Sequence, residues 1–153
     1  MRINLLNRTF VWISLFSVFI VTSSHKAEDF GYLYMKLKGK TLVDWKSTKM
    51  IPDKYVSEIL QIAGTNGNSE LWIQVPNPEL KKTRHLEVTD LNHFTDEKHN
   101  MFLIQRGTIS VSEMGDQWIK GYFEFSAADN RSSSTITAIN GYYKVPNPGR
   151  FRK

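Results

Sequence analysis

The chain contains no cysteine among its 153 residues. No disulfide bond is therefore available, and we expect a packed apolar core to stabilise the fold. Lipid attachment to a bacterial envelope protein requires a cysteine at the cleavage site, so the sequence excludes a lipoprotein. It also excludes a cysteine nucleophile.

Apolar runs long enough to span a bilayer are absent as well. The N-terminal run from Phe10 to Val21 has 12 residues, whereas a membrane span takes roughly 18 or more. Arg2 and Arg8 precede this run and small polar residues follow it, an order typical of a secretory signal peptide. We predict a signal peptide over residues 1–24, with an uncleaved membrane anchor as the alternative. The protein is then exported, periplasmic or secreted, and has no stable membrane anchor after cleavage.

The excess of positive charge is small. Without Arg2 and Arg8 the formal net charge falls from +5 to +3, and the basic residues are spread along the chain, so we expect no nucleic-acid partner. Residues 25–153 suffice for one domain with one core. A short basic tail begins at about residue 146, and we expect it to fray.

Alternation with a period of two dominates from residue 30 onward. In residues 118–127 one side carries Ile119, Gly121, Phe123, Phe125 and Ala127. This pattern predicts a central strand of an antiparallel sheet, with Phe123 and Phe125 in the core. Residues 32–38 form a first strand by the same criterion, with Leu33, Met35 and Leu37 pointing inward.

Residues 52–75 admit two interpretations. Pro52 and Asp53 are typical of a helix start, but the Thr65–Asn68 stretch is a strong turn signal between two alternating segments. We favour a hairpin that pairs residues 59–63 with residues 71–75, and we allow a short helical turn near residues 53–57.

Further strands are predicted at residues 86–88, 101–107, 108–113 and 135–145. Asn140-Gly141 is either a two-residue hairpin turn or a bulge within one strand, and we choose the bulge because too few residues follow for a return strand. The fold class is all-β, an antiparallel β-sandwich or flattened β-barrel of about seven to nine strands with at most one short helix.

Three segments carry apolar and glycine positions of one pattern, namely Leu60, Ile62, Gly64 and Leu71–Ile73, then Gly121, Phe123, Phe125 and Ala127, then Ile139, Asn140, Gly141 and Tyr143. In these positions the chain resembles a group of uncharacterised small envelope proteins of Bacteroidetes-type bacteria. The resemblance implies an all-β fold in the cell envelope and brings no catalytic residue. Many members of the group look like lipoproteins, which this chain, lacking cysteine, does not.

Catalytic patterns are weak in this sequence. His85, His93 and His99 are candidate zinc ligands, but their spacing matches no tight pair on a helix or hairpin. The serines lie in turn-like and strand-edge positions, without a nucleophile motif. We therefore predict no enzyme activity, no metal and no cofactor.

Tyrosines are the remaining lead. Tyr32 and Tyr34 share a strand face with two lysines, and Tyr122 lies on the face opposite Phe123 and Phe125. An exposed row of Tyr32, Tyr34 and Tyr122 predicts a surface for contact with a protein or a glycan. The alternative, that these tyrosines cover the second face of a closed sandwich, is favoured.

Three hypotheses of function follow. The first is a secreted or periplasmic, non-catalytic binding protein with a protein partner of unknown identity. The second is a small lipocalin-like β-barrel that holds a small apolar ligand. The third is an envelope immunity or antagonist protein that neutralises a toxin.

Overall fold

The computed structural model describes residues 31–53, 58–149 and 151. The predicted signal peptide, residues 1–24, lies outside the described residues, as does nearly all of the helical turn considered at residues 53–57. The described residues form strands and no helix, and thus include no helix long and apolar enough to cross a bilayer. The strands are β1 (Tyr32–Lys38), β2 (Leu42–Lys46), β3 (Lys49–Met50), β4 (Ile59–Asn66), β5 (Ser69–Pro76), β6 (Thr83–His85), β7 (His93–Thr95), β8 (Met101–Met114), β9 (Trp118–Asp129) and β10 (Thr135–Pro146).

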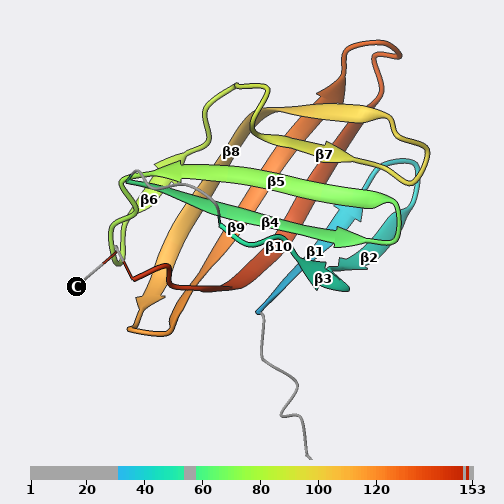
Figure 1. Ribbon diagram of the computed structural model, residues 1–153. Coiled ribbons are helices and arrows are strands. Elements are labelled where there is room, and N and C mark those ends of the chain that lie inside the picture. The colour runs from blue at the N-terminus through green and yellow to red at the C-terminus, as the bar shows by residue number, and fades with distance from the viewer. Residues whose placement is uncertain (1–30, 54–57, 150, 152–153) are drawn as a thin grey trace, which may run out of the picture.

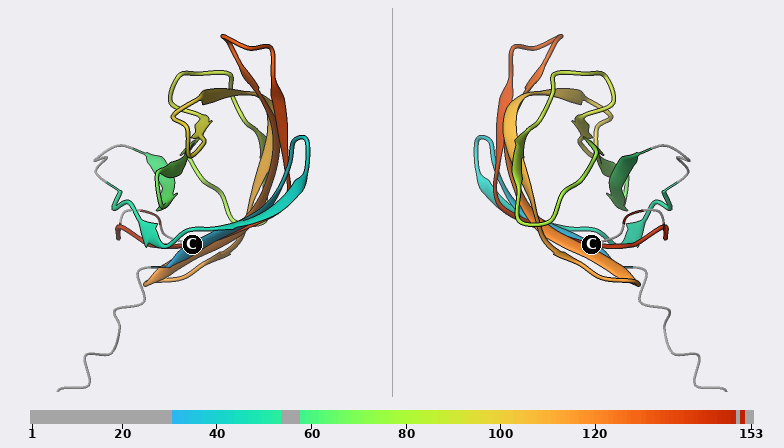
Figure 2. Two further views of the ribbon diagram at one scale, coloured as in Figure 1. Left: turned by 90° about the vertical axis from the view of Figure 1, so that its right-hand side faces the viewer. Right: turned by 90° about the vertical axis from the view of Figure 1, so that its left-hand side faces the viewer.

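These strands form one antiparallel sheet in the order β2-β1-β10-β9-β8-β7-β5-β4-β3, with β6 paired to β8. The sheet curls strongly, and the β4–β5 hairpin faces β9 and β10 across the interior (Figures 1 and 2). The predicted all-β antiparallel fold is confirmed. The sheet has ten strands because β3, β6 and β7, of only two or three residues each, join the longer ones.

The two ends of this sheet are joined through Ser47 and Thr48. These residues lie between β2, which pairs with β1, and β3, which pairs with β4. The Ser47 amide donates to the Leu33 carbonyl at 2.9 Å, and the Leu33 amide donates to Ser47 Oγ at 2.8 Å. The Thr48 amide donates to the Thr65 carbonyl at 2.7 Å. One chain segment thus changes partner from β1 to β4 and gives the sheet the shape of a flattened barrel.

The predicted hairpin is confirmed as β4 and β5. Ile59 pairs with Pro76 and Asn66 with Ser69, so Gly67 and Asn68 form the turn. Gly67 has a φ of 58°, in the left-handed region that glycine adopts at little cost. The asparagine–glycine signal therefore had a local physical cause, and it identified the hairpin correctly.

Two predictions in the middle of the chain are wrong. Residues 101–107 and 108–113 are one strand, β8, with irregular pairing near Gln105 and Ser112. Gly107 lies in its interior opposite Phe125 and marks no turn. The short strand predicted at residues 86–88 lies earlier, at Thr83–His85, because pairing with β8 selects those residues.

Asn140 confirms the bulge interpretation. The strand β10 continues through it, and its register against β9 shifts between Ala138 and Gly141. Asn140 has a φ of 53°, which asparagine tolerates better than most residues. The extra residue restores the alternation so that Ala138, Gly141 and Tyr143 all face inward.

Aromatic rings lie over glycines in the curled part of the sheet. Gly121 pairs with Tyr143 and Gly141 with Phe123, and a Cβ on Gly141 would lie 2.6 Å from the Phe123 ring. The Tyr143 ring crosses Gly121, and its hydroxyl donates to the Ser110 carbonyl at 3.0 Å. Glycine leaves room for a ring across the strand, which is one device that lets a sheet curve.

The core fills the interior of this curled sheet. Phe123 and Phe125 are buried as predicted, with ring centroids 6.1 Å apart. Leu33 and Met35 are fully buried and Leu37 is partly buried. Trp45 is also in the core, where its indole N–H donates to Ser69 Oγ at 2.8 Å.

The expectation of a frayed C-terminal tail is wrong for the described residues after Pro146. The Asn147 amide donates to the Gln117 carbonyl at 2.8 Å, and Asn147 Nδ2 donates to the Gly115 and Phe151 carbonyls at 2.8 and 2.9 Å. Phe151 packs against the core. An apolar side chain within the basic tail therefore anchors it.

We predict that Gly121→Ala destabilises the fold. Its Cβ would overlap the Ser110 carbonyl oxygen and the Tyr143 hydroxyl, so we expect a loss of about 3 kcal/mol in the free energy of unfolding. Urea denaturation measures this loss. In the control, Gly115→Ala, the new Cβ meets only the Trp118 carbonyl oxygen, at 3.6 Å, and the change should stay within about 0.5 kcal/mol. Equal stability of the two variants would contradict the ring-over-glycine packing.

Candidate functional site

The structure places Tyr32, Tyr34 and Tyr122 together on the outer face of the sheet. Tyr34 pairs with Tyr142 across β1 and β10, and Tyr142 pairs with Tyr122 across β10 and β9. Tyr32 and Tyr122 are 37% and 57% exposed. We call these four residues, Tyr32, Tyr34, Tyr122 and Tyr142, the tyrosine face. No second layer covers it among the described residues, so the favoured alternative of a buried sandwich face is wrong.

Tyr142 holds the tyrosine face together. Its ring centroid lies 5.5 Å from that of Tyr32 and 5.4 Å from that of Tyr122. These separations are those of favourable aromatic pairs. The rings therefore restrain one another before any partner arrives, which lowers the entropy lost when a partner orders them.

Polar and charged side chains contact the rings of Tyr34 and Tyr32 and that of the neighbouring Trp118. The Tyr34 hydroxyl donates to Asp44 Oδ1 at 3.0 Å. The Lys46 ammonium lies 5.9 Å from the Tyr32 ring centroid, and that of Lys144 lies 4.1 Å from the ring of Trp118. Such cation–π contacts keep the lysines beside the aromatic side chains.

Basic residues outnumber acidic ones on the outer face of β1, β2, β8, β9 and β10. The strand register assigns to this face the basic residues Lys36, Lys38, Lys46, Arg106, Lys120 and Lys144 and the acidic residues Asp44, Glu113 and Glu124. Glu113 is paired with Lys120 at 2.8 Å, and Asp44 accepts from Tyr34. The tyrosine face thus lies in a mostly positive surrounding.

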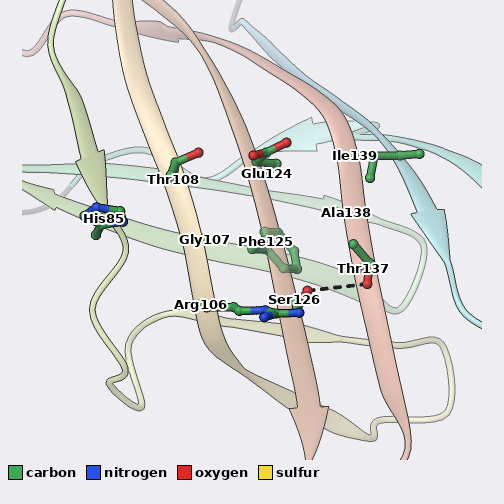
Figure 3. A pocket seen from close by; sticks show the side chains of 10 residues that line it. All are labelled: His85, Arg106, Gly107, Thr108, Glu124, Phe125, Ser126, Thr137, Ala138 and Ile139. Carbon is green, nitrogen blue, oxygen red and sulfur yellow. Dashed lines mark hydrogen bonds between the residues drawn. The ribbon is translucent and has the colours of Figure 1, made fainter.

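A depression of about 470 Å³ borders the tyrosine face. Its polar side chains come from the neighbouring strands β8, β9 and β10 and from the short β6, and Ile139 flanks it on β10 (Figure 3). The strand residues that contribute them are Arg106 and Thr108 on β8, Glu124 and Ser126 on β9, and Thr137 on β10, with His85 on β6. Ser126 Oγ and Thr137 Oγ1 are 3.5 Å apart. Glu124 and Tyr122 lie on the same face of β9, so the depression extends the surface open to a partner.

The environment of the face shifts three pKa values. The hydrogen bond to Asp44 raises the pKa of Tyr34, and desolvation and the negative charge of Asp44 act in the same direction. Burial raises the pKa of Tyr142, to which repulsion from Tyr32 adds. The bond to Glu113 raises the pKa of Lys120. These shifts keep Tyr34 and Tyr142 neutral and Lys120 charged at neutral pH.

The three candidate histidines lie on separate parts of the structure. His85 is on β6, His99 is in the connection between β7 and β8, and His93 on β7 stacks on Trp72 with ring centroids 6.3 Å apart. Within the ranges that the structure describes, no group of three or more histidine or acidic side chains could hold a metal ion. The tyrosine face and the charged side chains around it offer ring faces, hydroxyls and charges for non-covalent contact.

Sequence reasoning did not assign Tyr142 to the tyrosine face. Its phase along β10 depends on the extra residue at Asn140, so alternation counted through this position is ambiguous. Lys144, two residues later, was the available signal, because it shares the outer side with Tyr142. Trp72 is partly buried and stacks on His93.

Comparison of the chain with protein-family models, with curated proteins and with solved structures found no match. The resemblance to small envelope proteins therefore stays a prediction.

We predict that Asp44→Asn lowers the pKa of Tyr34 toward its ordinary value of about 10. The amide carries no charge to disfavour the phenolate. Because the folded-state pKa is raised, the bond stabilises the fold fully below the unfolded-state pKa, and this contribution is lost as pH rises through the folded-state pKa. Tyrosinate absorbance against pH, taken as the difference from Tyr34→Phe, measures the shift.

The control for this titration is Asp116→Asn, which changes an exposed acid in the turn before β9. It should leave the Tyr34 titration as in the wild type. A Tyr34 titration unchanged in Asp44→Asn would show that the bond does not form in solution.

Proposed function

We propose that the protein is an exported, non-catalytic binding module that uses the tyrosine face to contact an acidic surface of another protein. One observation carries this proposal: the rings of Tyr32 and Tyr122 both pack on that of Tyr142, with Tyr34 paired beside it, so that tyrosines from three adjacent strands form one cluster on the outer face. Export rests on the sequence pattern of residues 1–24.

Tyrosine suits a protein interface for a physical reason. Its ring contributes a large apolar contact while its hydroxyl keeps a polar group for the partner or for water. Tyrosines are accordingly enriched among the residues that carry most of the binding energy at protein interfaces. Among the four residues of the tyrosine face, Tyr122 is the most exposed, at 57%, and therefore has the most surface to bury against a partner.

Charge indicates the kind of partner. Lys36, Lys46 and Lys144 border the tyrosine face, and a partner with carboxylates at matching positions would be steered toward them. A basic partner would meet like charges, at a cost in both rate and affinity. The immunity hypothesis is one case of this proposal, in which the acidic partner is a toxin.

We predict that Tyr122→Ser weakens binding of the partner at least tenfold, because the exposed ring would be central to the contact. The immobilised chain captures proteins from envelope extract, and each captured protein is then purified and its Kd measured by calorimetry. Binding should also weaken as salt increases, since the attraction between lysines and carboxylates is screened.

Val88→Ser serves as the matched control. It also removes an apolar side chain that is 59% exposed, but in a loop far along the chain from the face, and it should leave the Kd unchanged. If every captured protein bound Tyr122→Ser as tightly as the wild type, or bound more tightly at high salt, the proposal would be wrong.

A further inference from the structure

The sheet has a gap on the side away from the tyrosine face. β5 pairs with β7 only through Glu70–Trp72. Among the described residues, this pairing on the edge of β5 away from β4 ends at Trp72. β8 pairs there with the short β6 instead. The wall is therefore interrupted between β5 and β6.

The connection between β6 and β7 runs across this gap and is held at Asn92. Asn92 Oδ1 accepts from the Gln74 amide at 2.7 Å, and Nδ2 donates to the Glu87 carbonyl at 2.9 Å. The Ile104 amide donates to the Asn92 carbonyl at 3.0 Å. These bonds fix the connection at β5 and β8 and leave space beneath it.

That space is a cavity of about 390 Å³. Small-molecule sites commonly measure about 300–1,000 Å³ and are mostly apolar with a few polar groups. Here Ile59, Val75, Leu86, Leu91 and Ile109 supply apolar lining, and Arg84, Thr89 and Asn92 are among the polar residues. Val75, Leu86 and Ile109 also belong to the core, so an apolar chain in the cavity would lie directly against it.

Arg84 is the unusual residue in this lining. Its pairing with Ile109, which is buried, puts its side chain on the inward side of β6. Arg84 Nε is buried and has no hydrogen-bond partner in the described chain. A buried donor without a partner costs roughly 1–3 kcal/mol, so natural structures seldom leave one unless a ligand or water completes it. The other such atom, Thr95 Oγ1, does not line this cavity.

Arg84 already has one anionic partner. Glu79 binds both Arg84 Nη2 and Lys82 Nζ, and together with Glu87, which lines the cavity, these side chains carry no net charge. The side chains of Arg84, Glu79 and Lys82 are 34%, 43% and 62% exposed, so solvent screens their charges. A ligand carboxylate at Arg84 Nε would therefore gain from the charge-assisted hydrogen bond itself and not from an excess of positive charge.

We propose that this cavity binds an amphiphilic monocarboxylate, with its carboxylate at Arg84 Nε and its apolar chain against Val75, Leu86 and Ile109. This site is separate from the tyrosine face, and it gives the ligand-binding hypothesis a definite location. The ligand enters through the gap between β5 and β6, beneath the connection held by Asn92.

Calorimetry of the full chain with decanoate tests the proposal. We expect saturable binding, at least tenfold weaker for Arg84→Met because a charge-assisted bond is lost. Decan-1-ol, which has the same chain without the carboxylate, should bind the wild type at least tenfold more weakly than decanoate. Arg131→Met removes an exposed arginine from the loop between β9 and β10 and should leave the Kd for decanoate unchanged.

A second variant covers the case in which Arg84→Met does not fold. Leu91→Asp changes a cavity residue that is 51% exposed, so thermal unfolding should be little altered, while its carboxylate repels that of decanoate. It should weaken decanoate binding more than decan-1-ol binding, because both ligands lose the apolar contact of Leu91 but only decanoate is repelled. The proposal fails if decanoate does not bind saturably, if decan-1-ol binds equally well, or if Leu91→Asp binds decanoate like the wild type.

Discussion

Packing of aromatic rings over glycines is the constraint on which the rest of this structure depends. Tyr143 crosses Gly121, Phe123 lies over Gly141, and Phe125 lies opposite Gly107. At Gly121 and Gly141 the ring of the neighbouring strand fills the space that the glycine leaves, and at Gly107 the Phe125 Cβ and the Glu124 carbonyl oxygen do so. Without these spaces the rings would push the strands apart, and β1 could not approach β4 closely enough for Ser47 to join the two ends of the sheet.

Filling the interior with these rings decides where a partner can bind. Phe123, Phe125 and Trp45 occupy space that an open barrel would give to a ligand. The surfaces that we propose for binding are the outer face, where the curvature displays Tyr32, Tyr122 and Tyr142, and the gap beside β5. The curl that buries the aromatic residues of one side of each strand exposes those of the other.

Strand elements were predictable where the signal is local. Alternation identified β1, β9 and β10, and the asparagine–glycine turn identified the β4–β5 hairpin. Prediction failed where the secondary structure of a residue depends on the strand with which it pairs. Gly107 resembles a turn residue in sequence, yet it lies within β8 because the Glu124 carbonyl oxygen and the Phe125 side chain occupy the space beside it. The positions of β6 and β7 likewise depend on pairing with β8 and β5, which composition does not encode.

The sequence by itself determined the all-β class and which side of each regular strand is apolar, because alternation follows directly from strand geometry. It also separated Tyr32, Tyr34 and Tyr122 from the core positions. Only the tertiary structure decided that these tyrosines meet through Tyr142 on a face that no other described segment covers, and that Arg84 lines a cavity. Both results depend on register and curvature, which are set by contacts between residues far apart in the chain.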